Sequence, residues 1–223
     1  MLMKLTLSLI SLSCFLTSAN GSLVILGVID GTLAGGAPKA VVLEATASIA
    51  DLSVYGIGSA NNGGGTDDQE FALPANAVSN GQHIIIASGQ NSSDFFTSNY
   101  PGGDFALFQS GAANVNGDDA IELFFNAAVI DTYGDINVSG AGESWDYIDG
   151  WAMRIGGSAG VFDPGNYSFS QGSLAGLTES QQAGLLDGAF GFGTAQVPEP
   201  STTLLGLVAL GSLAIRRRRS KQA

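Results

Sequence analysis

The sequence predicts an all-β domain, a β-sandwich of two packed sheets, with an apolar segment at each end of the chain. Glycine is abundant, at 32 of 223 residues, and charged residues make up only 13%. Short apolar runs alternate with clusters of Gly, Asn and Asp, which favour turns. Many short strands separated by turn residues are typical of a sandwich. We therefore divide the chain into residues 1–19, a β-domain over residues 20–197 and a C-terminal segment over residues 198–223.

Residues 1–19 have the organisation of a secretory signal peptide. Lys4 precedes an apolar stretch from Leu5 to Leu16, and small residues follow up to Ala19. This arrangement predicts export and cleavage after Ala19. The chain's one cysteine, Cys14, lies inside the segment, so we expect the mature protein to lack disulfides, a thiol nucleophile and cysteine-bound metal.

The apolar runs of the β-domain give the expected strands in order. Asn126-Ala127 joins two of them by a tight connection, which predicts a β-hairpin over Ile121–Tyr133. A helical pattern is confined to Glu179–Leu186. The expected strands are Ser22–Ile29, Ala40–Thr46, Leu52–Tyr55, Glu70–Leu73, Gln82–Ala87, Asp104–Phe108, Ala120–Phe125, Ala128–Tyr133 and Trp151–Ile155.

The charge of the exported part is strongly negative. All 20 acidic residues lie between Asp30 and Glu199, where the basic residues are Lys39 and Arg154 alone. This stretch carries a formal charge of −18, against −12 for the whole chain. So negative a surface repels nucleic acids and anionic lipids, and it attracts divalent cations and basic partners. We expect no nucleic-acid partner, while a solvated acidic surface and specific ion binding both stay open.

The sequence gives little support for enzymatic chemistry. Gly156–Gly160 matches the G-x-S-x-G pattern around Ser158, but the nucleophile elbow requires a strand-to-helix turn and a histidine later in the chain. His83, the one histidine, comes earlier and alternates with isoleucines in a predicted strand. We therefore expect His83 to be an exposed or packed strand residue, and we expect no enzyme activity and no cofactor.

Two groups of acidic residues are candidate binding sites. Asp118, Asp119 and Glu122, with Asp131 and Asp135 nearby in sequence, supply the oxygen ligands that calcium prefers. Their spacing is not that of an EF-hand, and Asp118-Asp119 equally suits a turn before the next strand. A second group interleaves carboxylates with aromatic rings that could stack on a sugar, or that pack on the edge of the sandwich. It consists of Glu143, Trp145, Asp146, Tyr147, Asp149 and Trp151.

The C-terminal segment has three parts. Pro198-Glu199-Pro200 is extended, because proline fixes φ and removes a backbone donor. The apolar run Thr202–Ile215 predicts a short transmembrane helix, roughly 21 Å long at about 1.5 Å per residue and thus shorter than a bilayer core of roughly 30 Å. The arginines that follow are expected to stay cytoplasmic, and they are Arg216, Arg217, Arg218 and Arg219.

These three parts resemble the PEP-CTERM sorting signal of Gram-negative bacteria. The resemblance implies recognition of Pro198, Glu199 and Pro200 by an exosortase, a membrane transpeptidase that removes the tail near the motif. It implies a role for Arg216–Arg219 as the stop-transfer segment, and retention in the inner membrane before processing. Proteins with this signal usually come from bacteria that make exopolysaccharide, which is therefore a possible partner.

The β-domain resembles the lamin-tail domain, an immunoglobulin-like β-sandwich that also occurs in secreted bacterial proteins. The resemblance implies a stand-alone binding or structural module and carries over no catalytic residue. It covers most of residues 22–170 as short motifs, namely Pro38–Glu44, Asp51–Ser53, Gly117–Leu123, Val129–Asp135 and Asp163–Phe169. Ala45-Thr46-Ala47 departs from the more polar loop of that family.

Taken together, the sequence predicts an exported, non-enzymatic protein of the cell envelope or extracellular matrix. An exosortase is expected to process it at the C-terminal signal, which leaves it at the cell surface or outside the cell. The alternative is a secreted module that binds carbohydrate or calcium through one of the two acidic groups.

Overall fold

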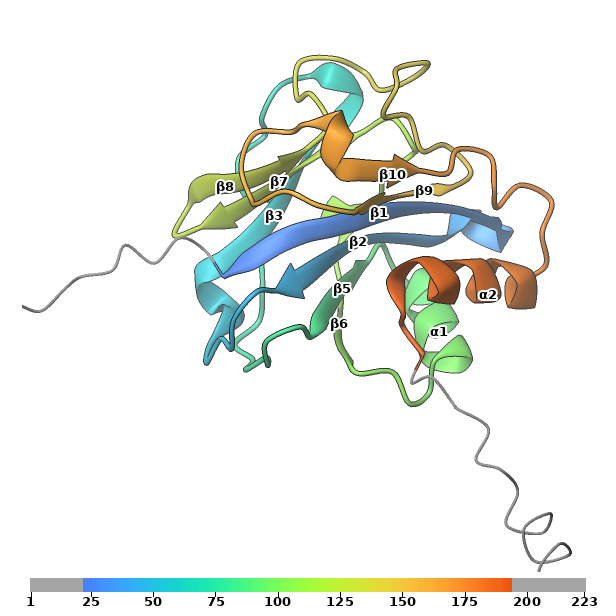
Figure 1. Ribbon diagram of the computed structural model, residues 1–223, viewed down its shortest axis with the longest axis horizontal. Coiled ribbons are helices and arrows are strands. Elements are labelled where there is room, and N and C mark those ends of the chain that lie inside the picture. Colours follow the sequence, from blue (N-terminus) through green and yellow to red (C-terminus); the bar gives the residue numbers. More distant parts are fainter. Residues whose placement is uncertain (1–21, 194–223) are drawn as a thin grey trace, which may run out of the picture.

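The computed structural model describes residues 22–193, which form two β-sheets and two α-helices (Figure 1). The larger sheet has six strands in the order β10-β9-β1-β2-β5-β6, and the smaller has four in the order β4-β3-β7-β8. This confirms the prediction of a β-rich fold with two sheets. The large sheet consists of β1 (Leu23–Leu33), β2 (Ala37–Ala45), β5 (His83–Ala87), β6 (Phe105–Gln109), β9 (Trp151–Arg154) and β10 (Tyr167–Phe169). The small sheet consists of β3 (Tyr55–Ala60), β4 (Phe71–Ala72), β7 (Ala120–Phe125) and β8 (Ala128–Tyr133).

Both faces of the large sheet are buried. Leu23 and Ile25 of β1 belong to the core between the two sheets, whereas Leu26 and Ile29 belong to a second core on the opposite face. The same alternation occurs in β2 and in β5, where Ile84 and Ile86 face one core and Ile85 the other. Strands buried on both faces read as continuous apolar runs, which is why these segments stood out in the sequence.

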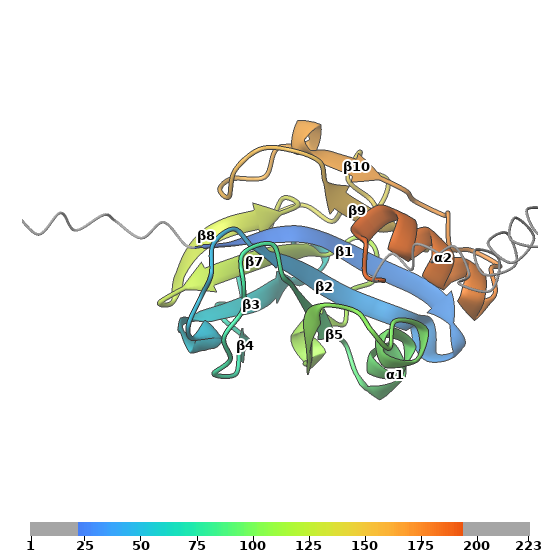
Figure 2. The ribbon, with the colours of Figure 1, turned by 60° about the horizontal axis from the view of Figure 1, so that its bottom comes forward.

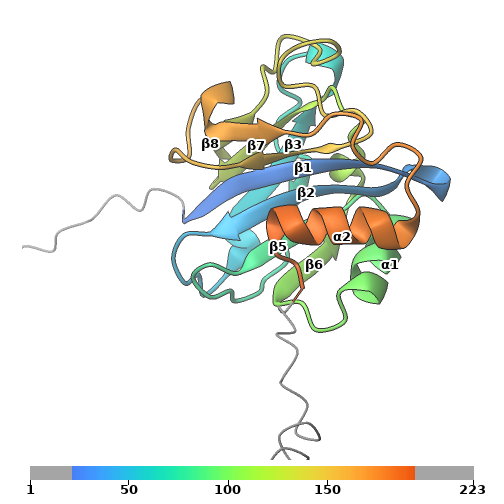
Figure 3. The same cartoon turned by 45° about the vertical axis from the view of Figure 1, so that its right-hand side comes forward.

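Two helices form the third layer, on the outer face of the large sheet (Figures 2 and 3). They are α1 (Gln90–Asn99) and α2 (Glu179–Phe190). Helix α1 connects β5 to β6 as a crossover between parallel strands. The sequence predicted α2, although it extends beyond the expected Leu186, and did not predict α1. The two helices are not part of the predicted sandwich. An immunoglobulin-like topology of its two sheets stays a prediction.

The C-terminal end of α2 is anchored to the sheet by aromatic side chains. Phe190 packs so close to β1 that a Cβ on Gly27 would lie 2.8 Å from its ring. Phe192 contacts the ring of Phe96 in α1, with centroids 5.5 Å apart. Gly191 ends the helix in the left-handed conformation at φ 70°, which glycine adopts without steric cost.

The hairpin predicted over Ile121–Tyr133 is formed by β7 and β8. Its two turn residues, Asn126 and Ala127, both have positive φ, at 49° and 62°, as a type I′ turn requires. The prediction of a strand over Leu52–Tyr55 was wrong for most of its length. Leu52–Val54 is a short 3-10 helix, because the carboxylate of Asp51 accepts the N–H of Ser53 and caps it.

Candidate functional site

The predicted sorting residues lie outside the described part of the chain. These are Pro198, Glu199, Pro200 and the arginines at 216–219, and the predicted signal peptide and apolar run lie outside it as well. No helix within residues 22–193 is long and apolar enough to cross a membrane. The described fold ends close to the motif. The carboxylate of Asp187 in α2 accepts the N–H of Gly193 at 2.5 Å, so the anchored part stops only a few residues before Pro198.

Asp118 and Asp119 bind loop groups of the protein itself. The buried carboxylate of Asp119 accepts the backbone N–H groups of Asn62 at 3.0 Å and Asn116 at 2.9 Å. The carboxylate of Asp118 accepts the hydroxyl of Ser139 at 2.8 Å. Burial raises the pKa of Asp119 above its ordinary value, while the two N–H groups oppose the rise. Asp119 therefore ties two loops to the start of β7.

Glu122 lies apart from this pair, within β7. Its neighbours Ile121 and Leu123 face the core between the sheets, so its own side chain lies on the outer face of the small sheet. The residue is nevertheless only 4% exposed, and its Oε2 atom has no hydrogen-bond partner. Within residues 22–193, no three His, Cys, Asp or Glu side chains are grouped to hold a metal ion.

The second candidate group contributes its aromatic rings to the core. Trp145 is 5% exposed and Tyr147 is fully buried. The hydroxyl of Tyr147 donates to the carbonyl of Asp119 at 3.1 Å, and that of Tyr133 donates to the carbonyl of Trp145 at 2.6 Å. Trp151 packs against the second core, beneath the helices. The sugar-stacking hypothesis needs exposed ring faces, and Trp145 and Tyr147 offer none.

Sequence reasoning did not predict that Asp131 and Arg154 meet inside the domain. Their side chains form an ion pair with 2.6 Å between Nη2 and Oδ2, and both are almost completely buried. Asp131 also accepts the N–H groups of Ile25 and Gly160, and Arg154 donates to the carbonyls of Ile25 and Ser158. The Arg154 guanidinium stacks on a tyrosine ring 4.8 Å away. This network joins the two sheets.

The other basic residue of the described chain, Lys39, is also bound inside the fold. Its ammonium donates to the carboxylate of Asp30 at 2.7 Å and to the carbonyl of Val115 and the amide of Asn116. Burial raises the pKa of Asp30, and the pairing with Lys39 opposes that rise. Lys39 thereby fastens β2 to the loop before Asp118.

Ser158 and His83 do not form a hydrolase site. Ser158 lies in the loop after β9, which leads to a 3-10 turn and strand β10 and not to an α-helix. His83 is half-buried at the start of β5 and packs edge-on against the ring of Phe192. Burial lowers its pKa below the ordinary value. The prediction of a packed strand residue therefore fits the position of His83.

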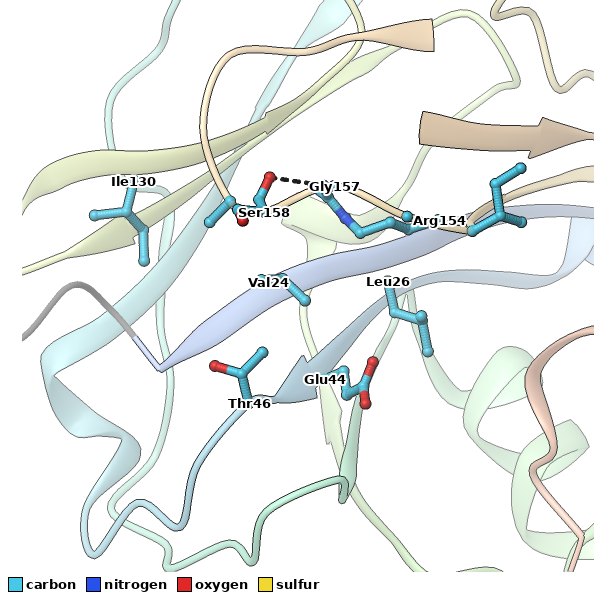
Figure 4. A pocket seen from close by; sticks show the side chains of 11 residues that line it. Val24, Leu26, Glu44, Thr46, Ile130, Arg154, Gly157 and Ser158 are labelled. Carbon is cyan, nitrogen blue, oxygen red and sulfur yellow. Dashed lines mark hydrogen bonds between the residues drawn. The ribbon is translucent and has the colours of Figure 1, made fainter. Parts of the chain in front are cut away.

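An open groove of about 860 Å³ lies beside the loop after β9 that contains Ser158 (Figure 4). Its floor is the outer face of the large sheet at the end of β1 and β2, and the loop after Arg154 forms its wall. The guanidinium of Arg154 is already committed to acceptors of the protein, so Glu44 and Thr46 are the free polar side chains of the floor. The lining residues are Val24, Leu26, Glu44, Thr46, Ile130, Arg154, Ile155, Gly156, Gly157, Ser158 and Ala159.

The fold and its polar groups define a β-rich domain whose charged side chains hold loops and strands together. Residues 196–220 match the PEP-CTERM protein-sorting motif. This confirms the predicted sorting signal, which marks an exported protein processed by an exosortase through a membrane-bound stage. The match does not extend to the β-domain, so its likeness to the lamin-tail domain stays a prediction. Comparison with curated proteins and with solved structures gave no match.

Proposed function

We propose that the chain is a non-enzymatic, exported protein whose β-domain is displayed in the cell envelope or the extracellular matrix. The observation that carries the proposal is the sorting motif over residues 196–220, which begins three residues after the last described residue, Gly193. The anchored end of α2 leaves the exosortase only a short connection between the folded domain and Pro198-Glu199-Pro200. The domain is therefore delivered as a folded unit, with its processing site beside it.

The proposed route has three steps. Residues 1–19 direct secretion, and the signal peptide is removed after Ala19. The apolar run Thr202–Ile215 then holds the chain in the inner membrane, with Arg216–Arg219 on the cytoplasmic side. An exosortase recognises Pro198-Glu199-Pro200 and removes the tail, so that the domain is released or attached at the cell surface. Exopolysaccharide is the matrix polymer with which we expect it to associate.

The described residues support a structural or binding role for a lamin-tail-like domain. Asp119, Asp131 and Arg154 are bound to backbone groups, and His83 is packed against an aromatic ring. Side chains held in this way serve to fix loops and strands. A general base or nucleophile, by contrast, must reach a substrate.

Intact-protein mass spectrometry on separate cell fractions tests the route. We expect a mature form that starts at Asn20 and ends near Pro198-Glu199-Pro200, in the surface or extracellular fraction. Any extra mass at that end identifies the group that the enzyme attaches. A form that keeps Arg216–Arg219 in every fraction would show that the tail is a permanent anchor and would overturn the proposed processing.

A substitution in the motif tests recognition directly. Glu199→Gln keeps the size of the side chain but removes its charge, so we expect the tail to stay uncleaved and the protein to accumulate in the membrane fraction. Glu143→Gln removes a charge from an exposed loop and serves as the matched control, which we expect to be processed normally. Normal processing of the Glu199→Gln variant would count against exosortase recognition of the motif.

A further inference from the structure

Glu122 has a buried carboxyl oxygen without a partner. The residue is 4% exposed, and its Oε2 atom neither touches solvent nor accepts a hydrogen bond. Its side chain lies on the outer face of the small sheet, a face that antiparallel sheets often leave to water. A carboxylate in such a position is unfavourable unless a positive charge or a hydrogen-bond donor reaches it.

The loop of residues 61–70, which connects β3 to β4, lies over the strand next to Glu122. Gly58 is the register partner of Glu122 on β3, and a Cβ on Gly58 would lie 2.2 Å from the carbonyl oxygen of Asp68. Cross-strand partners project from the same face about 4.5–5.5 Å apart. The carboxylate of Glu122 and the carbonyl of Asp68 therefore share one layer above the sheet. Both groups are acceptors.

Further oxygen atoms lie on the other side of Glu122. Its register partner on β8 is Thr132, whose hydroxyl lies on the same face of the sheet. Thr132 also lines a cavity of about 380 Å³ together with Asp135, among others. The loop of residues 61–70 is fastened across this region, because the N–H of Gly65 donates to the carbonyl of Ile136 at 2.8 Å. The cavity thus lies beside Thr132, the cross-strand partner of Glu122.

The cations within residues 22–193 have other partners than Glu122. Lys39 and Arg154 are the basic residues of the described chain, and each is held elsewhere, by Asp30 and Asp131 respectively. The histidine, His83, belongs to the other sheet. The described residues therefore offer Glu122 no cation, whereas the strongly acidic domain concentrates cations from solution around itself.

We propose that Glu122 is the anionic ligand of a calcium ion held between β7 and the loop of residues 61–70. The carbonyl of Asp68 and the hydroxyl of Thr132 are the neutral ligands, and water completes the shell. Calcium accepts such mixtures of carboxylate, carbonyl and water oxygens in irregular geometry, whereas magnesium demands a near-ideal octahedron. With one carboxylate in the site, we expect a Kd of about 10⁻⁴–10⁻³ M, the range of extracellular calcium modules.

Calorimetric titration and thermal melting of the purified full chain, with calcium and then with EDTA, test the proposal. We expect one calcium per chain. We expect Tm to rise by about 3–6 °C when calcium is at ten times its Kd, and the rise to vanish in EDTA. Magnesium at equal ionic strength should give a clearly smaller rise. A wild-type chain that binds no calcium in the titration would overturn the proposal.

The Glu122→Gln variant distinguishes calcium binding at this site from nonspecific screening of the acidic surface by calcium. The amide keeps the shape of Glu122 and can donate to the carbonyl of Asp68, so we expect a folded variant whose Tm does not respond to calcium. Glu143→Gln, on an exposed loop, should respond as the wild type does. Equal calcium responses of wild type and Glu122→Gln would overturn the site. If Glu122→Gln does not fold, the titration of the wild type is the test, and it must show one calcium ion bound per chain.

Discussion

Asp131 of the small sheet and Arg154 of the large sheet together bind both backbone groups of Ile25 in β1. Asp131 accepts the N–H of Ile25 at 2.7 Å, and Arg154 donates to its carbonyl at 2.8 Å. Strand β9 pairs with β1 only from Gly27 to Ile29, so the two side chains take the place of a neighbouring strand at Ile25. The buried ion pair thus supplies hydrogen-bond partners for the edge of β1 at Ile25. One member of the pair comes from each sheet of the sandwich.

Asp131→Ala should destabilise the fold by about 3–5 kcal/mol, because it leaves the buried guanidinium of Arg154 without its counter-charge. It also removes the acceptor of the Ile25 and Gly160 N–H groups. Urea unfolding of the full chain measures the change in the free energy of unfolding. Glu143→Ala, on an exposed loop, is the control and should change it by less than about 0.5 kcal/mol.

The double variant Asp131→Ala/Arg154→Met distinguishes pairing from simple loss of contacts. Once both charges are gone, no unpaired ion remains buried, so the double variant should lose less than the sum of the two single variants. Strictly additive losses would show that the two residues act independently, contrary to the 2.6 Å contact.

Ala127→Gly should stabilise the protein by about 0.5–1 kcal/mol. Ala127 has a φ of 62° in the turn between β7 and β8, a conformation that strains a residue with a Cβ and suits glycine. Ala128→Gly, one residue further on and within β8, is the matched control and should destabilise by a similar amount, because glycine weakens a strand. Thermal melts of the two variants should move in opposite directions, and a fall in Tm for Ala127→Gly would contradict the strain.

His83 should make the stability of the protein sensitive to mild acid. Burial lowers the pKa of His83 in the folded state, although Glu44 and Asp104 oppose the shift. The unfolded chain therefore takes up a proton near the ordinary pKa of about 6.5, while the folded protein does so only at lower pH. The stability that depends on neutral His83 is fully present above about pH 6.5 and is lost as the pH falls below it.

His83→Gln cannot titrate and so isolates this effect from the carboxylates that both proteins share. Urea unfolding at pH 7.5 and pH 5.5 should show that acid lowers the stability of the wild type relative to the variant. A difference between the two proteins that stays constant across these pH values would contradict the lowered pKa of His83.

The sequence predicted the elements that depend on local pattern. The hairpin around Asn126-Ala127 follows from turn chemistry, and α2 begins at the expected Glu179. Helix α1 was missed because its sequence, QNSSDFFTSN, contains poor helix formers. Its stability comes from tertiary contacts, since Phe95 and Phe96 are buried against the large sheet. Tertiary packing decides such segments, and local propensity does not reveal them.

The candidate site residues also divide into features that local sequence predicts and features that depend on tertiary contacts. Asp118, Asp119 and Glu122 stand out as an acidic group in the sequence, but strand alternation sends Glu122 to the outer face. One partner of Asp119, Asn116, is close in sequence, but the other, Asn62, comes from a loop 57 positions away. The pairing of Asp131 with Arg154 could not be predicted, because nothing in their sequence spacing indicates that they meet across two sheets. The sorting motif was readable because its three parts are adjacent in the chain.

The attachment of α2 also determines how the domain bears a mechanical load. A pull at the C-terminal end enters the described fold at Gly193, where one hydrogen bond to Asp187 holds the chain to the helix. The force then acts on the contacts of Phe190 and Phe192 with the outer face of the large sheet. These contacts can be peeled away one at a time, whereas the strands of the sandwich must be separated together. For a protein tethered by its tail, α2 is therefore the first part to yield, and the sandwich beneath it is shielded from the strain.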